Sequence, residues 1–260
     1  MTSNIDIYNQ QNYYVVKSNE IIQKSRFSMA LQQYKLLLYI ISKIKPNDEP
    51  GKKYTFTIGD YCRVCNIDDD SGKNYADLKA ALKDLADKSM WMESPDGKRE
   101  ILLRWLNRIV INKYSGTVEV EFHPDMFPYL LDLQERYTQY KLECVLAMRS
   151  KYSVRLYELL KSYEHMETII NFSIADLKKR IDCDKYPRFP DFRRYALDKA
   201  VDDINRYSDI QVKYRLTKEG SRAYTKISFF IVGSSGIDAH IQHFNRRHSL
   251  EVSSKKGGRG

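Results

Sequence analysis

The residues best suited to a chemical task lie in the segment RFPDFRRYALDK (residues 188–199). Pro190 and Asp191 are typical of the first turn of a helix, so Arg193 and Arg194 are expected in its opening turns. The arginine fork donates two parallel hydrogen bonds, a geometry that matches the O6 and N7 atoms of guanine. The chemistry suggested by this segment is therefore the reading of DNA bases.

Polar residues around these arginines extend the predicted DNA-binding surface. At 100° per residue, Tyr195, Lys199 and Arg206 point away from Leu197, which we assign to the core. The following predicted strands carry cations suited to phosphate contacts, which fix register on a duplex but not sequence preference. A hairpin that is merely soluble has the same composition. The DNA-binding residues predicted in this half of the chain are Arg188, Arg193, Arg194, Tyr195, Lys199, Arg206, Lys213, Arg215, Lys218 and Arg222.

An earlier segment, LKAALKDLADKSMW (residues 78–91), has the periodicity of a second such helix. If Leu78 faces the core, two alanines lie between two lysines on the opposite face. Alanine can contact thymine methyl groups, and lysine can contact guanine or phosphate. An ordinary solvated face fits this pattern equally well. The candidates in this half of the chain are Lys73, Ala76, Lys79, Ala80 and Lys83.

The residues that DNA nicking would require are missing from the sequence. A rolling-circle enzyme needs a His-hydrophobic-His metal pair, and no two of the five histidines are separated by a single residue. No Walker phosphate loop occurs either. Cys62 and Cys65 form an isolated Cys-x-x-Cys pair, far from Cys144 and Cys183, which does not match a zinc motif. We expect free thiols, no metal, no cofactor and no enzymatic activity.

The charge balance favours an anionic partner. The 260 residues include 43 Lys and Arg against 34 Asp and Glu, which gives a formal charge of +9. This excess favours nucleic acid ahead of a membrane surface. The opening residues lack the basic start and apolar run of a signal peptide, and no apolar stretch is long enough to cross a bilayer. We therefore expect a cytoplasmic protein without a membrane partner.

Three blocks of sequence occur twice, in the same order. FTIGDY (residues 56–61) matches FSIADL (residues 172–177) at an offset of 116, and LKAALKDLADKSMW matches LDKAVDDINRYSDI (residues 197–210) at an offset of 119. Upstream, Tyr34 corresponds to Tyr152 at an offset of 118. Chance similarity between amphipathic helices would not preserve both order and distance, so the sequence predicts two copies of one domain.

Each copy has the element order of a winged helix. An amphipathic helix, beginning near Leu31 in the first copy, precedes a short strand, and Thr57 or Ser173 then stands as the N-cap of a second helix. A third helix and two strands follow. The predicted strands are residues 54–56, 101–112 and 117–122 in the first copy and residues 169–172, 209–216 and 223–232 in the second. We predict an α+β fold of two tandem winged-helix domains related by internal duplication.

The predicted domain limits follow from this duplication. The first winged-helix domain is expected over residues 12–135 and closes with HPDMFPYLLDL, in which Pro124 lies near a helix start. The polar residues 134–140 are predicted to connect it to the second, DNA-binding domain at residues 136–233. Residues 234–260 have the composition of a disordered basic tail.

Several segments resemble one known family. KYSVRLYELLKSY (residues 151–163), FSIADLKKRI (172–181) and PDFRRYALDKAVDDIN (190–205) resemble the tandem winged-helix plasmid replication initiators of bacteria, which bind origin repeats called iterons. The resemblance extends over about residues 13–232. It implies that Arg193 and Arg194 belong to a recognition helix. Because the corresponding helix of the first copy contains no arginine, it remains open whether that helix reads bases or grips phosphates.

The resemblance also implies partners. Members of this family bind iterons as monomers with both winged helices on one duplex, help to open an AT-rich stretch, and recruit a host initiator and the replicative helicase. Their homodimers, in equilibrium with the monomer and often formed through the first domain, tend to repress their own gene. A transcriptional regulator with two winged helices would use the same surface, so this alternative stays open from the sequence.

Overall fold

The computed structural model describes residues 13–67, 71–94, 98–131, 133, 135–166, 169–218 and 223–233. The predicted basic tail at 234–260, the predicted DNA contact Arg222 and the first residue of the predicted first domain lie outside the described residues. Among the described helices, none combines the length and the apolar character needed to cross a bilayer.

The first copy is a winged helix built from three helices and a three-stranded antiparallel sheet. Its strands lie in the order β2-β6-β5, so the central strand is the last one along the chain. The predicted helical spacing holds: the apolar side chains of α3 and of α5 are buried against the sheet. The elements are α3 (Leu31–Ile41), β2 (Lys53–Thr57), α4 (Ile58–Val64), α5 (Ser71–Asp87), β5 (Leu106–Ile111) and β6 (Thr117–Phe122).

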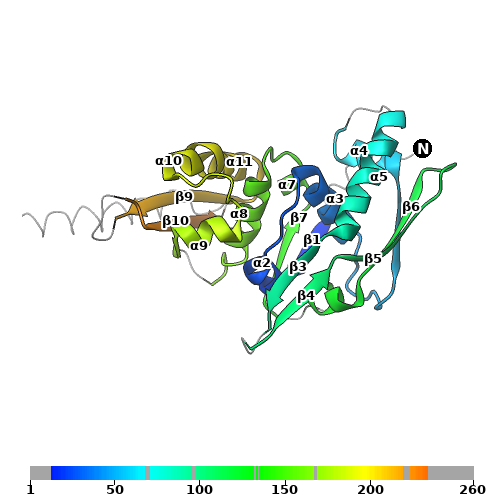
Figure 1. The fold of residues 1–260 in the computed structure, drawn as a ribbon, viewed down its shortest axis with the longest axis horizontal. Helices are drawn as coiled ribbons and strands as arrows, with labels where there is room; N and C mark the ends of the chain where they lie inside the picture. Colours follow the sequence, from blue (N-terminus) through cyan, green and yellow to red (C-terminus); the bar gives the residue numbers. More distant parts are fainter. Residues whose placement is uncertain are drawn as a thin grey trace, which may run out of the picture.

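The second copy repeats this arrangement, and the predicted fold class is confirmed. Its sheet has the equivalent order β8-β10-β9, again antiparallel, and α8 packs against α11 as α3 packs against α5. Figure 1 shows this copy beside the first, with α8, β7, β1 and α2 between the two sheets. The elements are α8 (Lys151–Lys161), β8 (Ile169–Ser173), α9 (Ile174–Arg180), α10 (Phe189–Phe192), η2 (Arg193–Leu197), α11 (Asp198–Tyr207), β9 (Ile210–Thr217) and β10 (Lys226–Gly233).

The duplicated N-caps are formed as the sequence predicts. The Thr57 hydroxyl accepts a hydrogen bond from the amide of Asp60 at 3.1 Å, and the Ser173 hydroxyl accepts one from the amide of Asp176 at 3.0 Å. Each hydroxyl satisfies one of the free amides at a helix start and so fixes where the strand ends and the helix begins. This local signal recurs because both copies need the same strand-to-helix junction.

A hairpin in the first copy corrects two predictions. The segment at residues 78–91 is not helical throughout, because α5 ends at Asp87 and strand β3 (Ser89–Glu93) follows. The predicted strand at 101–112 is broken into β4 (Glu100–Arg104), which pairs with β3, and β5, which pairs with β6. The fully buried Trp105 lies between them. Alternation of buried and exposed side chains after Asp87 has period two, which favours a strand over a helix.

The predicted connection at residues 134–140 is also wrong in part. Strand β7 (Tyr137–Lys141) pairs antiparallel with β1 (Tyr14–Ser18), an element that the sequence did not predict. The segment reads as polar because its exposed side chains are polar, but Thr138 and Tyr140 alternate inward and are buried. The domain boundary at residue 136 stays a prediction.

Short elements complete the fold. Pro124 begins the turn η1 (Pro124–Met126), as predicted, and α6 (Phe127–Leu130) follows it. The helices α2 (Asn19–Lys24) and α7 (Glu143–Leu146) follow β1 and β7, so they lie at opposite ends of this antiparallel pair. The buried apolar residues of both copies form one continuous cluster, so the two winged helices share a core at their junction.

Candidate nucleic-acid interface

The predicted recognition helix of the second copy is a continuous helical run with a widened turn near its start. Pro190 lies in the first turn of α10, where its missing amide costs no hydrogen bond. In η2, the amide of Asp198 donates to the carbonyl oxygen of Arg193, five residues earlier. Such π-helical turns are frequent at functional sites. Phe192 and Leu197 on either side of the turn are buried, which leaves the intervening arginines at the surface.

Arg193 is held by neighbours on its own domain. Its Nε donates to the Tyr214 hydroxyl at 3.1 Å, and the same nitrogen lies 3.5 Å from a carboxylate oxygen of Asp198. The Tyr214 hydroxyl in turn donates to Asp198 at 2.5 Å. Burial and this carboxylate raise the pKa of Tyr214, so the phenol stays a donor. Because the ion pair is half-exposed, it is weak enough for a phosphate or a base to displace Asp198.

Arg194 and Lys199 flank an exposed aromatic ring. The Arg194 guanidinium carbon lies 5.3 Å, and the Lys199 ammonium nitrogen 5.8 Å, from the ring centre of Tyr195. Tyr195 is 40% exposed and stacks on Tyr186 at a centroid distance of 5.6 Å and an interplanar angle of 29°. In the described part of the chain, neither cation forms an ion pair. Both are thus positioned by the ring and free to bind an anion or a base edge.

The two outer arginines of the predicted set pair with nearby acids. Arg188 precedes the helix, and its Nε donates a hydrogen bond at 2.8 Å to Asp191 in the first turn of α10. Arg206, near the helix end, lies 3.7 Å from Asp202. Both arginine side chains are exposed, and surface ion pairs of this kind contribute little to the stability of the fold. Arg188 lies near Arg194 in the chain, whereas Arg206 lies at the far end of the helix.

The hairpin separates the predicted phosphate-binding residues into two groups. Lys213 and Arg215 alternate with Tyr214 along β9, and Tyr214 faces the helices, so both cations lie on the outer face of the sheet. Lys218 instead lies beyond the end of β9, 4.9 Å from the ring centre of Tyr224. The structure therefore brings Lys218 toward the predicted recognition helix but places Lys213 and Arg215 on another face.

Two aromatic side chains that the sequence did not single out connect these elements. Tyr224 packs against Phe189 at 5.3 Å between ring centres, which joins the hairpin to the first turn of α10. Tyr186 forms the base of the Tyr195 stack, and Lys185 lies 5.8 Å from its ring centre. The alternation of basic and aromatic residues in DKYPRFP (residues 184–190) was the signal that could have found Tyr186.

The third helix of the first copy presents the predicted face to solvent. Leu78, Leu82 and Leu85 are buried, as the helical spacing requires. Lys83 pairs with Asp87 at 2.5 Å, so the positive charge of this lysine is partly offset by a neighbouring acid. The candidate residues Lys73, Ala76, Lys79, Ala80 and Lys83 are all exposed and lie on one helix, α5.

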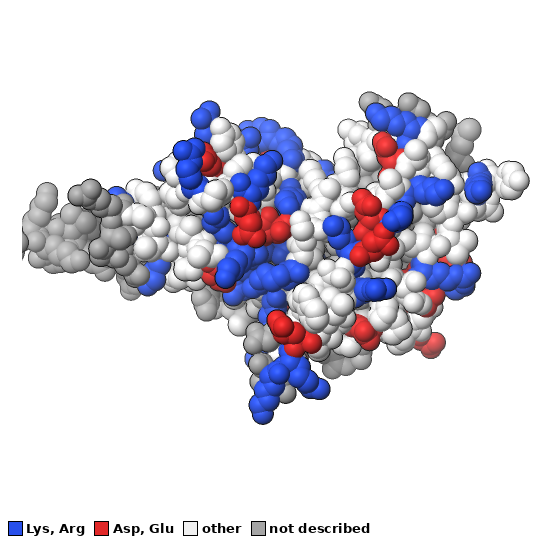
Figure 2. Space-filling model, viewed as in Figure 1, with Lys and Arg blue, Asp and Glu red and all other residues white. Residues whose placement is uncertain are grey.

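Basic side chains are distributed unevenly over the two copies. On the face shown in Figure 2, Lys and Arg crowd over α9 and α10 of the second copy. Over α4 and α5 of the first copy they lie further apart and mixed with Asp and Glu. The second copy therefore has the stronger attraction for a polyanion.

The cysteines do not form a reactive centre. Cys62, Cys65, Cys144 and Cys183 form no disulfide, and burial raises the pKa of Cys65 to about 12 and that of Cys183 to about 11. The thiols of Cys65 and Cys183 therefore stay protonated at neutral pH and are poor nucleophiles. Within the described residues, no three His, Cys, Asp or Glu side chains come together as a metal site.

Comparisons with known proteins identify relatives over most of the chain. Residues 14–161 match the family "Initiator Replication protein, WH1", and residues 173–231 match "Initiator Rep protein, WH2". A replication initiation protein of Escherichia coli is 28% identical over 207 residues, which are 76% of this chain and 64% of that protein. The PI protein of Escherichia coli is 27% identical over 173 residues, 60% of this chain and 56% of that protein.

One solved structure has the same fold. The Pi initiator protein, determined in complex with iteron DNA, superposes with a TM-score of 0.70 at 20% identity and covers 86% of this chain and 99% of that one. This chain spans less than two thirds of the length of the two Escherichia coli relatives. The match to both winged-helix modules, in order and over the duplicated fold described above, shows that the chain belongs to the Initiator Replication protein family.

Proposed function

We propose that this protein initiates plasmid DNA replication by binding directly repeated origin sequences, iterons, in double-stranded DNA. The observation that carries the proposal is the exposed surface of Arg194, Tyr195 and Lys199 at the start of the second recognition helix. The bound DNA of the Pi initiator protein, which shares the fold, supports the same ligand here.

The duplication gives the proposal a specific geometry. Each winged helix carries one recognition helix, and a helix of this size enters the major groove. Two of them on one duplex face are separated by about one turn, roughly 10 base pairs, so one chain would cover about two turns. Because α5 and α10–α11 differ in sequence, the site they read need not be palindromic. Direct repeats of such a site are what iterons are.

The proposed role continues beyond DNA binding. Bound to its origin in the cytoplasm, the protein would promote opening of the adjacent duplex and recruit the host initiator and the replicative helicase. It would do so without enzymatic activity of its own. A homodimer in equilibrium with the monomer would repress its own gene.

A plasmid replication assay tests the proposal against the regulator alternative. A plasmid that carries the DNA flanking this coding sequence, with the protein supplied from elsewhere, should persist in a host that cannot otherwise replicate it. Replacing Arg193 and Arg194 together by alanine should abolish persistence while the protein still accumulates. Persistence of the plasmid without any protein would exclude the initiator role and favour a transcriptional regulator.

Substitution of Lys218 by glutamine is expected to weaken binding to specific and random duplexes alike. Because Lys218 is suited to a phosphate contact, the slope of log affinity against log salt should fall by about one unit. Lys213→Gln is the matched control, since this residue carries the same charge on the outer face of the same hairpin and should change the slope less. Titrations at several salt concentrations measure both. Unchanged slopes for Lys218→Gln would remove it from the interface.

An exposed apolar patch on the β3–β4 hairpin supports the homodimer. Trp91 and Leu102 are 55% and 47% exposed, and they are direct cross-strand partners on the solvent face. We expect Trp91→Lys to shift the protein to monomer in sedimentation equilibrium because a charge opposes burial of this patch. Tyr114→Lys, at a fully exposed aromatic of the β5–β6 turn, should leave the dimer intact. Equal dimer fractions in both variants would rule out this patch.

A further inference from the structure

A buried carboxylate lies at the junction between the two winged helices. Glu158 on α8 is 2% exposed, and it accepts hydrogen bonds from the hydroxyls of Tyr34 and, at 2.5 Å, Tyr140. It also forms an ion pair with Lys17, which is equally buried. Lys17 lies in β1, Tyr34 in α3 and Tyr140 in β7. Three segments that precede α8 in the chain thus converge on one side chain of this helix, which begins the second copy.

The duplication indicates that this carboxylate is not needed by a winged helix as such. At the repeat offset of 118, Glu158 corresponds to Ile40 of α3, and Arg155 corresponds to Leu37. Both counterparts are fully buried apolar residues. The same helix face is therefore apolar where it packs within the first copy and charged where α8 meets the other domain.

Arg155 adds directional contacts beside Glu158. Its Nη2 donates to the carbonyl oxygens of Ser25, at 3.3 Å, and of Arg180, at 2.6 Å, so it bridges the two copies. Its guanidinium carbon lies 4.1 Å from the ring centre of Phe27. Arg180 itself donates to the carbonyl oxygen of Gln23 at 2.8 Å. Contacts of this kind depend on angle as well as distance, unlike apolar packing.

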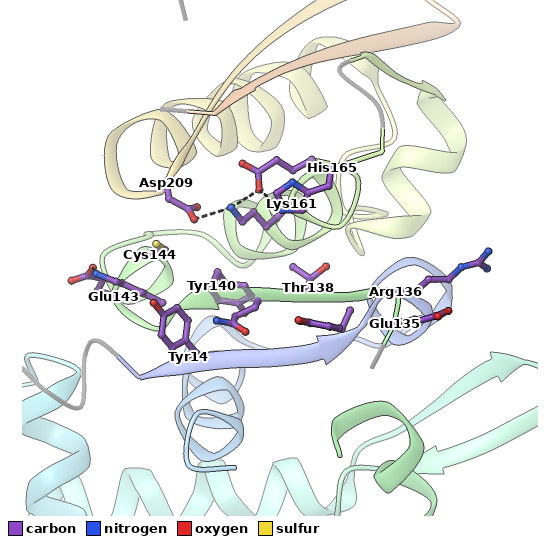
Figure 3. Close-up of a pocket in the computed structure, with 14 residues that line it drawn as sticks. Tyr14, Glu135, Arg136, Thr138, Tyr140, Glu143, Cys144, Lys161, His165 and Asp209 are labelled. Carbon is purple, nitrogen blue, oxygen red and sulfur yellow. Dashed lines mark hydrogen bonds and ion pairs between the residues drawn. The ribbon is translucent and has the colours of Figure 1, made fainter. Parts of the chain in front are cut away.

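The other side of the junction is open. Figure 3 shows a cleft between β7 and the second copy, with Thr138 and Tyr140 on one wall and the Lys161–Asp209 pair on the other. The cleft has a volume of about 700 Å³. Lys161 and Asp209, 2.8 Å apart, both belong to the second copy, so they do not tie the domains together. Next to this cleft, Asn19 and Gln23 donate hydrogen bonds to Ser162 of the second copy, at 3.2 Å and 3.0 Å.

A buried cluster of charges is better suited to specify geometry than to add stability. Desolvation of Lys17 lowers its pKa, and Glu158 offsets part of this effect. Burial and Glu158 raise the pKa values of Tyr34 and Tyr140, so both phenols remain donors. Apolar replacement of such a cluster is often neutral for stability, whereas any other orientation leaves a charge unpaired. The cluster therefore favours one orientation of the two winged helices over others.

We propose that Glu158, acting through Lys17, Tyr34 and Tyr140, fixes the angle between the two winged helices and thereby sets the spacing of the two half-sites that one chain binds. Glu158 is a positioning residue and does not touch DNA. The effect of Glu158 on the angle follows from the contacts described above, and its effect on the spacing of half-sites rests on the proposed function.

The test uses an apolar-cluster variant of the full chain, which combines Lys17→Met, Tyr34→Phe, Tyr140→Phe and Glu158→Leu. Removing these four groups together leaves the buried Arg155 guanidinium, which keeps its hydrogen bonds to the carbonyl oxygens of Ser25 and Arg180, so the variant should fold, as checked by its thermal melting curve. The matched control combines Lys151→Met with Asp182→Asn, which removes a partly buried ion pair at the start of the same helix.

The spacing readout needs no knowledge of which bases are read. The probe is the duplex protected in a footprint of the DNA that flanks the coding sequence, with its centre lengthened or shortened by one and by two base pairs. Each base pair rotates one half-site against the other by about 35°. The wild type and the control should bind one spacing best, with losses of about 10-fold or more two base pairs away. The apolar-cluster variant should bind all spacings within about 3-fold and the isolated second half-site within about 2-fold of wild type.

A second measurement addresses the angle without DNA. Paired spin labels, attached through non-natural amino acids at positions 83 and 213, report the distribution of distances between the two copies. The distribution should be narrow for the wild type and the control, and broad or displaced for the apolar-cluster variant. An unchanged distribution, or an unchanged spacing profile, would overturn the proposal, and so would equal losses on half-sites and full sites. A wild type that binds no paired half-sites contradicts the proposed function, and the label distances then still decide the role of Glu158.

Discussion

Replacing Arg194 with alanine is expected to weaken binding to the specific site by about 1–3 kcal/mol and to relax the sequence preference at one position. Arg194 lies in the widened turn at the start of the recognition helix and is held against Tyr195 without a carboxylate partner in the described structure. Its fork is therefore available for a guanine edge. Titration of a set of duplexes, each altered at one base pair, measures both effects.

Two further variants show whether the effect is specific to Arg194. Arg193→Ala should have a similar effect at a different base pair, although Arg193 must first release Asp198 and Tyr214. Lys179→Ala removes a positive charge from the exposed face of the neighbouring helix α9 and should leave the sequence preference intact. If the Arg194 change weakened random DNA as much as specific DNA, the arginine would contact phosphate and not a base.

Replacing Glu158 alone with leucine is expected to lower the free energy of unfolding by about 3–5 kcal/mol. The change leaves the buried ammonium of Lys17 without its carboxylate, and the hydroxyls of Tyr34 and Tyr140 without their acceptor. Adding Lys17→Met should restore most of the loss, because the ammonium that lost its carboxylate is then removed. Asp182→Asn, which breaks the more exposed pair with Lys151, should cost about 1 kcal/mol or less. Denaturant unfolding of these variants provides the values.

The loss in Glu158→Leu should also depend on pH in a defined direction. Burial lowers the pKa of Lys17, and removing Glu158 removes the influence that raises it, so the pKa falls further below that of the unfolded chain. Between these two pKa values the unfolded chain binds one more proton than the folded chain, so stability rises with pH. The deficit of Glu158→Leu relative to wild type should shrink from neutral pH toward about pH 10. A deficit independent of pH would mean that Lys17 is not the cause.

Local signals account for the elements that the sequence predicted correctly. The caps at Thr57 and Ser173 and the spacing of leucines in α5 involve residues within one turn of each other, and the duplication gave each a second, independent occurrence. Pro190 and Asp191 likewise predicted the start of the helix that carries Arg193 and Arg194. Predictions of this kind succeed because the interacting residues are close to each other in the sequence.

The elements that were missed depend on distant partners. β7 forms a strand because β1, more than a hundred residues earlier, supplies its hydrogen bonds, and its own sequence looks like a polar linker. Glu158 reads as one polar residue on an amphipathic helix, since Tyr34 and Lys17 reach it only after both copies have folded. Lys213 and Lys218 lie apart because Lys213 faces outward from β9, whereas Lys218 lies beyond the end of that strand. The predicted hairpin fixed neither the face of Lys213 nor the end of the strand.

The most direct test of the central claim is a footprint of the purified wild-type protein on the DNA flanking its coding sequence, at physiological salt. We expect regularly spaced protected units in direct repeat, each covering about two turns, with strong cleavage between them. Monomer-enriched protein, such as the Trp91→Lys variant, should protect the same units. A single protected inverted repeat over the promoter, unchanged with monomer-enriched protein, would contradict iteron binding by two linked winged helices.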